Sequence, residues 1–365
     1  MPSLAGGGAE RVFVQLANEF AAHGCRVDLI LASAHGPYID EVSQGVTVIS
    51  YGKSGVLCAL PKLIRYLRGQ KPDVMLSGLA HANVISIFAN LGAGRATRCV
   101  ISARSIPSVW YRANKSLRSW TLLQLMRAAY RFADTIIVNS QAVASDLNRF
   151  LMLSKKRMRV VYNPVDIDAI EDLSLEDVNH DWCKPGAPLL LLGVGRLDVL
   201  KDFPTLIRAF SLIRSQRDCR LVILGEGPDR ADLEHLIHSL GLQRDVFLAG
   251  FVKNPFAWMR CAGVVVSSSL TEGCPNAIMQ ALACGTPVVS TDCEGGSAEI
   301  LEDGKWGKLV AVGDPAAMAG AIVKTLDETK QSDGRLRAKD FAIDRIAREY
   351  LQVILPLNNA PTRVH

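Results

Sequence analysis

An acidic residue just ahead of a helix that starts with proline is the feature of this sequence best suited to chemistry. Glu272 is followed by Gly273, Cys274, Pro275 and Asn276, and the missing N–H of proline costs nothing in the first turn of a helix. The unpaired N–H groups of such a turn, with the positive end of the helix dipole, favour an anion. A carboxylate repels phosphate, so we expect Glu272 to accept hydrogen bonds from sugar hydroxyls. The stretch therefore predicts a site for a phosphorylated sugar.

A second loop supplies positive charge. After an apolar run that ends at Val194 come the flexible Gly195, then Arg196 and, five residues later, Lys201. A guanidinium forms forked hydrogen bonds to a diphosphate, and an ammonium adds a compact charge. Taken alone, the two cations would be interpreted as solvated surface charges. Beside the Glu272 stretch they favour a diphosphate site that includes Gly195.

The spacing from Glu272 to Gln280, with residues 281–289 after it, resembles the signature of family 4 of the retaining glycosyltransferases, which have the two-domain GT-B fold. The resemblance implies that Glu272 faces the donor sugar and that the amides of Asn276 and Ala277 bind the distal phosphate. It also implies that the side chain at position 280 forms hydrogen bonds to the ribose hydroxyls. The family usually has an acid there, and Gln280 departs from it. An amide can accept from one hydroxyl and donate to another, so we expect a weaker grip on the nucleotide.

Further ligand contacts follow from the same resemblance. Arg196 and Lys201 take the place of the metal that other glycosyltransferases use, so we expect no metal and no cofactor apart from the nucleotide-sugar donor. Glu226 lies in a turn after a strand, where open α/β sheets bind ligands. Phe251 and Val252 fall where relatives hold the nucleotide base through backbone groups. Such contacts constrain the base loosely, and they favour UDP over GDP.

Residues of the first half complete the expected site. Gly7 and Gly8 precede a helical pattern, and glycines there let backbone amides approach a ligand closely. His81 follows a strand, where relatives have a His or polar group that contacts the donor sugar. A lone His is also commonly structural, and both interpretations stay open.

The start of the chain is unusual for the family that it resembles. Relatives carry the glycine pair after a first β-strand, whereas only residues 1–5 precede it here. No strand of useful length fits, so the first domain is expected to lack its first strand. Either the true start lies upstream or the first sheet lacks a central strand, which would leave exposed edges.

Bulk composition predicts a soluble, cytoplasmic chain of about two domains. The sequence has 365 residues, is 49% hydrophobic and contains no apolar run near the length of about 20 residues that crosses a bilayer. No signal peptide is visible. The nine cysteines are odd in number and lack a paired metal spacing, as expected of reduced thiols. Cys274 alone lies in the motif, and a core role is the simpler interpretation of it.

Short apolar runs alternate with helical patterns along the whole chain, which predicts α/β architecture with parallel sheets. We expect the GT-B fold, with two doubly wound Rossmann-like domains facing a cleft. Residues 1–163 are expected to bind the acceptor, residues 164–337 the nucleotide sugar, and residues 338–365 to form a helix that returns to the first domain plus a flexible tail. The predicted strands span residues 26–32, 46–51, 73–77, 99–103, 135–139, 159–162, 189–194, 220–224, 246–249, 263–267, 287–290 and 308–310.

Positive charge is concentrated in the first half. Residues 1–160 hold 20 Lys and Arg against 8 Asp and Glu, whereas residues 161–365 hold 21 against 28. Much of the excess lies between positions 104 and 159, where basic residues interleave with aromatic and aliphatic ones, a composition typical of a basic amphipathic helix on anionic lipid. An ordinary surface helix is the alternative. A nucleic-acid surface would also be basic, but no nucleic-acid module is recognisable, so we expect no nucleic-acid partner. The residues are Trp110, Tyr111, Arg112, Lys115, Leu117, Arg118, Trp120, Leu122, Leu123, Leu125, Met126, Arg127, Tyr130 and Arg131.

Together these features predict a retaining glycosyltransferase of bacterial cell-surface glycan synthesis. It would move a hexose or N-acetylhexosamine from a nucleotide sugar, with UDP favoured, to a lipid-linked or polysaccharide acceptor at the cytoplasmic membrane face. No nucleophile is evident in the first domain, so attack on the same face as departure fits better than a covalent intermediate. Two alternatives stay open, a sugar-nucleotide epimerase or hydrolase of the same fold and a non-catalytic glycan-binding relative.

Overall fold

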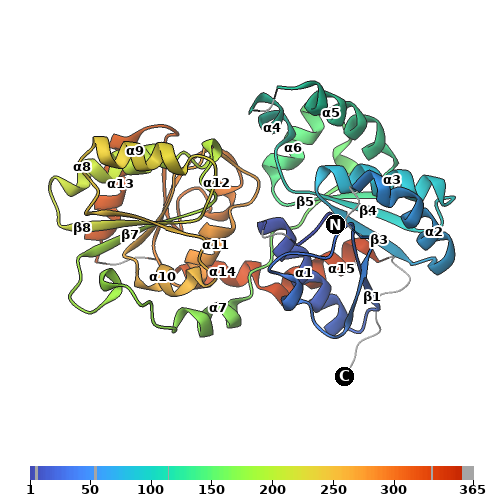
Figure 1. Cartoon of the computed structure of the whole chain (residues 1–365), viewed down its shortest axis with the longest axis horizontal. Coiled ribbons are helices and arrows are strands. Elements are labelled where there is room, and N and C mark those ends of the chain that lie inside the picture. Colours follow the sequence, from blue (N-terminus) through green and yellow to red (C-terminus); the bar gives the residue numbers. More distant parts are fainter. Residues whose placement is uncertain (5–6, 53–55, 114, 330–331, 356–365) are drawn as a thin grey trace. The chain divides into compact units, whose positions relative to one another are not determined.

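A computed structural model describes residues 1–4, 7–52, 56–113, 115–329 and 332–355 (Figure 1). The chain divides into two compact units. Unit 1 comprises Met1–Pro164 and Ile343–His365, and unit 2 comprises Val165–Ala342. Each unit has its own parallel sheet and its own helices, and each is described by itself.

Unit 2 is built on a six-stranded parallel sheet in the order β14-β12-β10-β7-β8-β9. Its central strands are continuous apolar runs because both of their faces are buried. A separate parallel pair, β11 and β13, lies outside this sheet. The strands are β7 (Leu189–Val194), β8 (Cys219–Leu224), β9 (Val246–Gly250), β10 (Val264–Ser267), β11 (Thr271–Glu272), β12 (Val288–Thr291), β13 (Glu294–Gly295) and β14 (Lys308–Val310).

Helices connect the strands of unit 2, and several of them begin where the sequence supplies a cap. Asn254 and Asp314 accept hydrogen bonds from first-turn amides, and each is followed by a proline in the first turn. Phe203, Leu206 and Phe210 of α8 pack into the core that the sheet shares with α9 and α13. The helices are α7 (Ile167–Ser174), α8 (Phe203–Arg214), α9 (Arg230–Ser239), α10 (Pro255–Cys261), α11 (Asn276–Ala283), α12 (Ser297–Ile300), α13 (Pro315–Asp327) and α14 (Gly334–Ala338), with the 3-10 turns η5 (Asp181–Cys183), η6 (Val199–Lys201) and η7 (Lys339–Phe341).

Unit 1 contains two parallel sheets, a four-stranded one in the order β3-β4-β5-β6 and a two-stranded one, β1-β2. The strands are β1 (Val27–Leu31), β2 (Val46–Ser50), β3 (Val74–Gly78), β4 (Arg98–Ala103), β5 (Thr135–Val138) and β6 (Met158–Val160). The helices are α1 (Gly8–Ala22), α2 (Leu60–Gln70), α3 (Ala80–Gly92), α4 (Pro107–Ala113), α5 (Leu117–Ala129), α6 (Gln141–Phe150) and α15 (Ile343–Ile354), with the 3-10 turns η1 (Ile39–Glu41), η2 (Val56–Ala59), η3 (Tyr130–Phe132) and η4 (Lys155–Arg157).

The α/β class and the doubly wound parallel arrangement predicted from the sequence are confirmed. Each of the twelve expected strands is present, with ends within two residues of the prediction. The two-residue strands β11 and β13 were not predicted, because a strand that short leaves no alternation pattern in a sequence. The late helical pattern forms α15, whose Tyr350 packs against Phe20 of α1 with ring centroids 6.4 Å apart.

The first residues of the chain pair with the end of β1 without forming a strand of their own. Met1 N donates to Ile30 O at 2.8 Å, and Ala32 N donates to Met1 O at 3.0 Å. This is the parallel ladder pattern, with Met1 opposite Leu31. Residues 1–4 thus run beside the end of β1, although they are too few to be a strand of their own. No strand before α1 is present among the described residues, and β1 and β3 stay in separate sheets.

The basic segment of unit 1 was interpreted from the sequence as a helix whose apolar side could lie on lipid. In the structure only part of that apolar side is exposed. Leu122, Leu123 and Met126 of α5 are buried in the core, where they pack with the fully buried Tyr130. The exposed apolar side chains are others, Leu117, Trp120 and Leu125, and the exposed cations Arg118 and Arg131 accompany them. None of the helices in the described ranges is long and apolar enough to cross a bilayer.

Candidate active site

Glu272 is held in place by a contact that only glycine allows. The strand β11, which contains Glu272, pairs with β13, and Gly296 N donates to Glu272 O at 3.2 Å. Gly295 has φ +152°, and a Cβ there would lie 1.8 Å from the Glu272 carbonyl oxygen. Any larger residue at position 295 would therefore push β11 away. The backbone position of Glu272 depends on this close approach.

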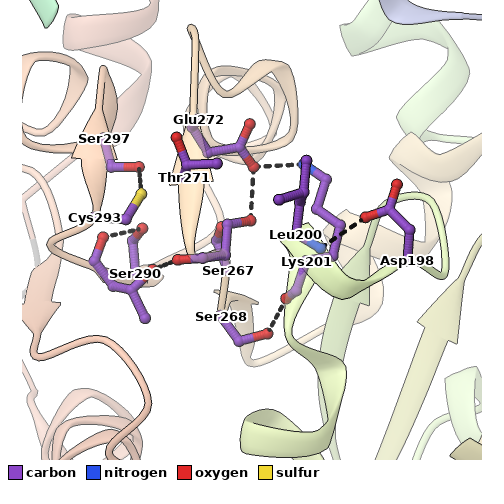
Figure 2. Close-up of polar contacts among 12 residues, drawn as sticks. Asp198, Leu200, Lys201, Ser267, Ser268, Thr271, Glu272, Ser290, Cys293 and Ser297 are labelled. Atoms are coloured by element: carbon purple, nitrogen blue, oxygen red, sulfur yellow. Dashed lines mark hydrogen bonds and ion pairs between the residues drawn. The ribbon is translucent and has the colours of Figure 1, made fainter. Parts of the chain in front are cut away.

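The carboxylate of Glu272 accepts two hydrogen bonds on one oxygen (Figure 2). Lys201 Nζ and Ser269 Oγ both donate to Glu272 Oε1, the serine at 2.7 Å. The Glu272 side chain is 12% exposed and that of Lys201 is 27% exposed. A paired charge in so little water is held in one geometry, and its hydrogen bonds are of the strong, charge-assisted kind.

Lys201 is positioned by its backbone and by its aliphatic stem. Asp198 Oδ1 accepts from Leu200 N at 3.1 Å at the start of η6, and Ser268 Oγ donates to Lys201 O at 2.7 Å. The stem crosses Gly195, where an added Cβ would lie 3.1 Å from Lys201 Cε. The structure thus shows what Gly195 does for the loop. It leaves room for the lysine that reaches Glu272.

The pKa of the Lys201 ammonium reflects two opposing effects. Burial is the largest and would lower this pKa, but the charge of Glu272 and its hydrogen bond, with smaller effects of Asp198 and Cys293, outweigh it. The net result is a pKa raised above the ordinary lysine value of 10.5. Lys201 is therefore a fixed cation throughout the neutral pH range, suited to neutralise a phosphate and unsuited to act as a base.

Arg196, the other predicted cation, is not in the Lys201–Glu272 cluster. Its side chain is 72% exposed, and its Nε lies 3.8 Å from Asp198 Oδ2. A long exposed side chain can move to meet a ligand, whereas Lys201 is already fixed. A ligand would therefore have to fix the Arg196 side chain on binding, at a cost in conformational entropy, whereas Lys201 needs no such ordering.

The turn that contains Glu226 is packed tightly against the Arg196 loop. Leu197 N donates to Glu226 O at 3.0 Å, and a Cβ at Gly225 would lie 1.8 Å from Gly195 O. The Glu226 carboxylate receives a hydrogen bond from Arg230 Nη1 at 2.6 Å.

The segment predicted to hold the base begins beside the same turn. Gly225 N donates to Gly250 O at 2.8 Å, so the chain enters positions 251 and 252 directly from this contact. Phe251 is exposed and Val252 is half-buried. The structure thus brings Gly195, Glu226 and the segment of Phe251 and Val252 to one edge of the unit 2 sheet.

The helix that follows Glu272 is α11, and it begins at Asn276. Both Ile278 N and Met279 N donate to Pro275 O, so Ala277 lies in the first turn, where amides lack intrahelical partners. Gln280 is half-buried one turn further on. Cys274 is buried, with its Sγ 4.0 Å from Met279 Sδ, which is the core role expected of it.

The remaining predicted residues, His81, Gly7 and Gly8, belong to unit 1. His81 is exposed near the start of α3, two residues after Leu79, whose φ is +73°. Gly7 N donates to Glu10 Oε2 at 3.0 Å, so a protein carboxylate engages this amide. Gly8 is the exposed first residue of α1. Their part in ligand binding stays a prediction.

Sequence reasoning missed the hydroxyl groups that support Glu272. Thr291 Oγ1 donates to Ser269 O at 2.6 Å, and Ser269 and Ser268 hold Glu272 and Lys201 as described above. The signal was present, because the apolar strand β10 ends at Ser267 and is directly followed by Ser268 and Ser269. Hydroxyl groups at the end of a parallel strand face the edge where such sheets bind ligands.

The chemistry open to these groups is narrow. Cys293 interacts electrostatically with both Lys201 and Glu272, and its thiol contacts Ser297 Oγ at 3.6 Å. Burial above all raises its pKa, so it is a neutral thiol rather than a nucleophile. Within the described ranges there is no group of three or more His, Cys, Asp or Glu side chains that could hold a metal ion. What the site offers is one fixed cation, one shielded carboxylate and several hydroxyl groups.

Comparison with known proteins agrees with this picture. Residues 188–328 match the family model described as glycosyl transferases group 1, and residues 6–169 match that of glycosyltransferase family 4. The Anabaena protein HepE, solved with UDP and glucose, superposes with a TM-score of 0.81 at 21% identity, over 99% of this chain and 98% of that one. The fold is thus that of the GT-B glycosyltransferases.

Two relatives from Campylobacter jejuni place the chain within that class. It is 34% identical, over 76% of its own length and 74% of the relative, to N-acetylgalactosamine-N,N'-diacetylbacillosaminyl-diphospho-undecaprenol 4-alpha-N-acetylgalactosaminyltransferase. It is 28% identical, over 98% of each chain, to an alpha-1,4-N-acetyl-D-galactosaminyltransferase that acts on a GalNAc-containing diNAcBac-PP-undecaprenol. The chain belongs to glycosyltransferase family 4 and is a glycosyltransferase.

Proposed function

We propose that this protein is a retaining glycosyltransferase that moves a hexose or N-acetylhexosamine from a UDP-sugar to a lipid-linked or polysaccharide acceptor. The observation that carries the proposal is the hydrogen-bonded pair of Lys201 and Glu272 at the ligand-binding edge of the unit 2 sheet.

The pair matches the chemistry of a sugar diphosphate. In such a donor the distal phosphate and the sugar hydroxyls are neighbours, so a protein must offer a cation and a hydrogen-bond acceptor side by side. Lys201 supplies the cation and Glu272 supplies the acceptor, one hydrogen bond apart. The first-turn amides of α11, which begins four residues after Glu272, suit the same phosphate.

The proposed step uses these groups to stabilise the departing diphosphate. As the bond between the anomeric carbon and the phosphate oxygen breaks, Lys201, Arg196 and the α11 amides take up the charge that develops on that oxygen. The acceptor hydroxyl attacks from the same face, forms the new glycosidic bond, and gives its proton to the leaving phosphate. Glu272 orients the sugar. In this scheme the cations do the work of a metal.

The acceptor class is drawn from the two Campylobacter relatives, whose names specify undecaprenyl-diphosphate-linked glycans. A polyprenyl-linked acceptor sits in a membrane, so we propose a peripheral position on the cytoplasmic membrane face. The exposed side chains of Leu117 and Trp120, with Arg118 between them, supply an apolar and cationic surface suited to it. This surface is smaller than the sequence suggested, because most apolar residues of α5 face the core.

The deciding experiment measures UDP release from a panel of UDP-sugars, with and without polyprenyl-diphosphate-linked glycans. The chain is compared with Glu272→Ala, and Asp232→Ala serves as a control that removes an exposed carboxylate of α9, elsewhere in unit 2. Release that requires the acceptor, is lost in Glu272→Ala and is kept in Asp232→Ala would support the proposal. Release without any acceptor would favour the epimerase or hydrolase alternative. Sugar binding without release from any donor would favour the non-catalytic one.

A further inference from the structure

Two cysteine side chains of unit 2, Cys183 and Cys261, meet in the fold although they are far apart in the sequence. Cys183 ends the 3-10 turn η5, and Cys261 ends α10. Their thiol groups are hydrogen-bonded to each other. Cys261 Sγ also lies 4.0 Å from Trp182 O, the carbonyl group of the peptide bond that leads into Cys183. The two sulfur atoms are therefore neighbours, while both residues are free thiols.

Aromatic rings hold η5 against α10 and the sheet. His180, just before η5, stacks on Phe247 of β9 with ring centroids 5.1 Å apart. The same ring lies 5.3 Å from that of Trp258 in α10. Trp182, inside η5, meets Phe247 edge-on at 6.4 Å. Because such ring pairs add to the stability of a packed arrangement, the turn that carries one thiol is fixed beside the helix that carries the other.

The segment that leads into the unit 2 sheet is tied to α10 at both ends of this helix. At the start of the helix, Asn254 Nδ2 donates to Leu173 O at 2.7 Å. At its end, Cys261 meets Cys183. Residues 173–183 are thus held by an amide hydrogen bond at one end and by two thiols at the other. A thiol is a weak hydrogen-bond donor, so the second contact is weak unless a covalent bond replaces it.

The two thiols differ in reactivity. The hydrogen bond from Cys183 lowers the pKa of the Cys261 thiol and outweighs the effect of burial. The same hydrogen bond, with burial, raises the pKa of Cys183. Since the thiolate is the form that attacks sulfur, Cys261 is the nucleophile of the pair. Both residues are also partly exposed, whereas Cys284 is buried and its pKa is raised to about 12.

We propose that Cys183 and Cys261 are a redox-sensitive pair that an excess of a low-molecular-weight disulfide, such as glutathione disulfide, converts to a disulfide bond that clamps η5 onto α10. The Cys261 thiolate attacks one sulfur atom of the oxidant, which gives a mixed disulfide and releases one thiolate. Cys183 loses its proton, and its sulfur attacks the Cys261 sulfur and displaces the second thiolate. Two electrons pass from the cysteines to the oxidant, which takes up their two protons and leaves as two thiols.

The clamp would lie away from the candidate active site. Cys183 precedes β7 and Cys261 precedes β10, and these strands are neighbours in the sheet. Gly263 N, two residues after Cys261, donates to Leu190 O near the start of β7 at 2.9 Å. The disulfide would therefore join the chain where it enters two adjacent strands, whereas the candidate site is at the edge where they end. The proposal does not depend on the proposed function.

The test oxidises the full chain with glutathione disulfide at about pH 8, where thiolates become available. Remaining thiols are blocked with N-ethylmaleimide, and bonds are located by non-reducing peptide mass spectrometry with fragmentation. Cys58, an exposed cysteine of η2 in unit 1, reports whether the reagent is active, because it should carry glutathione. Cys183→Ser and Cys261→Ser each remove one member of the pair, and Cys58→Ser is the matched control. Thermal unfolding of each protein is measured before and after oxidation.

The proposal expects a bond between Cys183 and Cys261 in the oxidised chain and in Cys58→Ser. Tm should rise by at least about 5 °C, because the bond closes a long loop in the unfolded chain, and dithiothreitol should reverse the rise. Neither variant of the pair should show it, and Cys183→Ser should carry glutathione on Cys261 instead.

Glutathione on Cys58 without a bond between Cys183 and Cys261 would overturn the proposal. The unmodified chain alone gives this result, so it does not depend on whether a variant folds. A bond that leaves Tm unchanged would also overturn the proposal, because the disulfide would then clamp nothing.

Discussion

Glu272 Oε1 accepts hydrogen bonds from both Lys201 and Ser269, so a single carboxylate oxygen joins the η6 turn to the loop after β10. Ser268, next to this serine, donates to the carbonyl of Lys201. The two segments are therefore locked together by contacts that include the candidate catalytic pair itself. Removing any member should move the others.

Glu272→Gln is the sharpest substitution at this pair, because it keeps the shape and removes the charge. Lys201 would stay buried but lose the attraction that raises its pKa, so this pKa should fall below the wild-type value. In the wild type the raised pKa means that Lys201 stays charged below pH 10.5, and that its stabilising pairing is lost only as the pH rises through the raised value. Acylation of Lys201, followed by peptide mass spectrometry between pH 7 and 11, measures the change. The Lys201 peptide in Glu272→Gln should react at lower pH, while Lys184, on an exposed turn, should react alike in both proteins.

Turnover should fall in the same Glu272→Gln variant by roughly 10²-fold, the usual loss for one preorganised polar group at a reacting centre. An amide can still accept a hydrogen bond from a sugar hydroxyl, so KM for the donor should change less than kcat. Donor-dependent UDP release measures both constants. Full activity in Glu272→Gln would show that the carboxylate only holds the loops together.

Ser269→Ala tests whether the serine positions the carboxylate. The change removes one hydrogen bond to Glu272, and a bond to a charged group is worth about 1.5–3 kcal/mol. We expect kcat/KM to fall by roughly tenfold to a hundredfold, and Tm to fall by a few degrees because the same bond also stabilises the fold. Ser239→Ala is the matched control, because its hydroxyl donates to Leu236 O on the exposed side of α9. An equal loss in both variants would remove the case for a positioning role.

The Glu272 stretch could be found from the sequence because acid, proline and helix start are local signals. The same holds for the strands, whose apolar runs are continuous because helices cover both faces. The sequence placed Lys201 in the same site, but the direct hydrogen bond between Lys201 and Glu272 could not be found this way. Lys201 is 71 residues away and meets it only because β7 and β10 are adjacent in the sheet. Pairing of strands across that distance depends on the whole fold.

Backbone contacts were even less accessible to sequence reasoning. Gly295 looks like any loop glycine in the sequence, and its close approach to Glu272 O follows from the pairing of two strands of two residues each. Similarly, the apolar residues of α5 were interpreted as one surface, because helical spacing shows a face without showing what covers it. Leu122 turned out to pack in the core and Trp120 to lie on the surface.

Gly295→Ala should disturb the site without touching any catalytic side chain. The added methyl group would meet the Glu272 carbonyl, and alanine is strained at φ +152°. We expect at least a tenfold loss of activity together with a lower Tm. Gly241→Ala separates backbone strain from the clash with the Glu272 carbonyl. Gly241 also has a positive φ of +70°, but no heavy atom lies within 4 Å of the added Cβ. The free energy of unfolding of this variant should fall by about the cost of a strained residue, roughly 1–2 kcal/mol, and its activity should persist.

The buried amino group of Met1 predicts a pH-dependent stability. Its pKa is lowered from 8.0 to about 6, so between these values the unfolded chain binds more protons than the folded one. The free energy of unfolding should therefore rise as pH increases from 6 to 8, by up to about 2–3 kcal/mol from this group. Urea denaturation from pH 5.5 to 8.5 measures the slope. A chain with an acetylated Met1 should lack the contribution of the amino group to this slope. The same slope in both forms would contradict the burial of the amino group.

Membrane contact through α5 is the last prediction, and it now rests on Leu117 and Trp120, two of the residues that the sequence favoured. Leu117 and Trp120 are 78% and 50% exposed, whereas the Arg127 guanidinium lies against the chain and donates to Phe150 O at 3.5 Å. Replacing Leu117 and Trp120 by serine should weaken binding to anionic vesicles by roughly tenfold at low salt, because two apolar anchors are lost. Leu212→Ser, an exposed leucine of α8 in unit 2, controls for general loss of apolar surface. Co-sedimentation with phosphatidylglycerol vesicles gives the affinities. Equal binding by the double variant and the unmodified chain would exclude this surface, while loss of binding in Leu212→Ser alone would place the contact on unit 2.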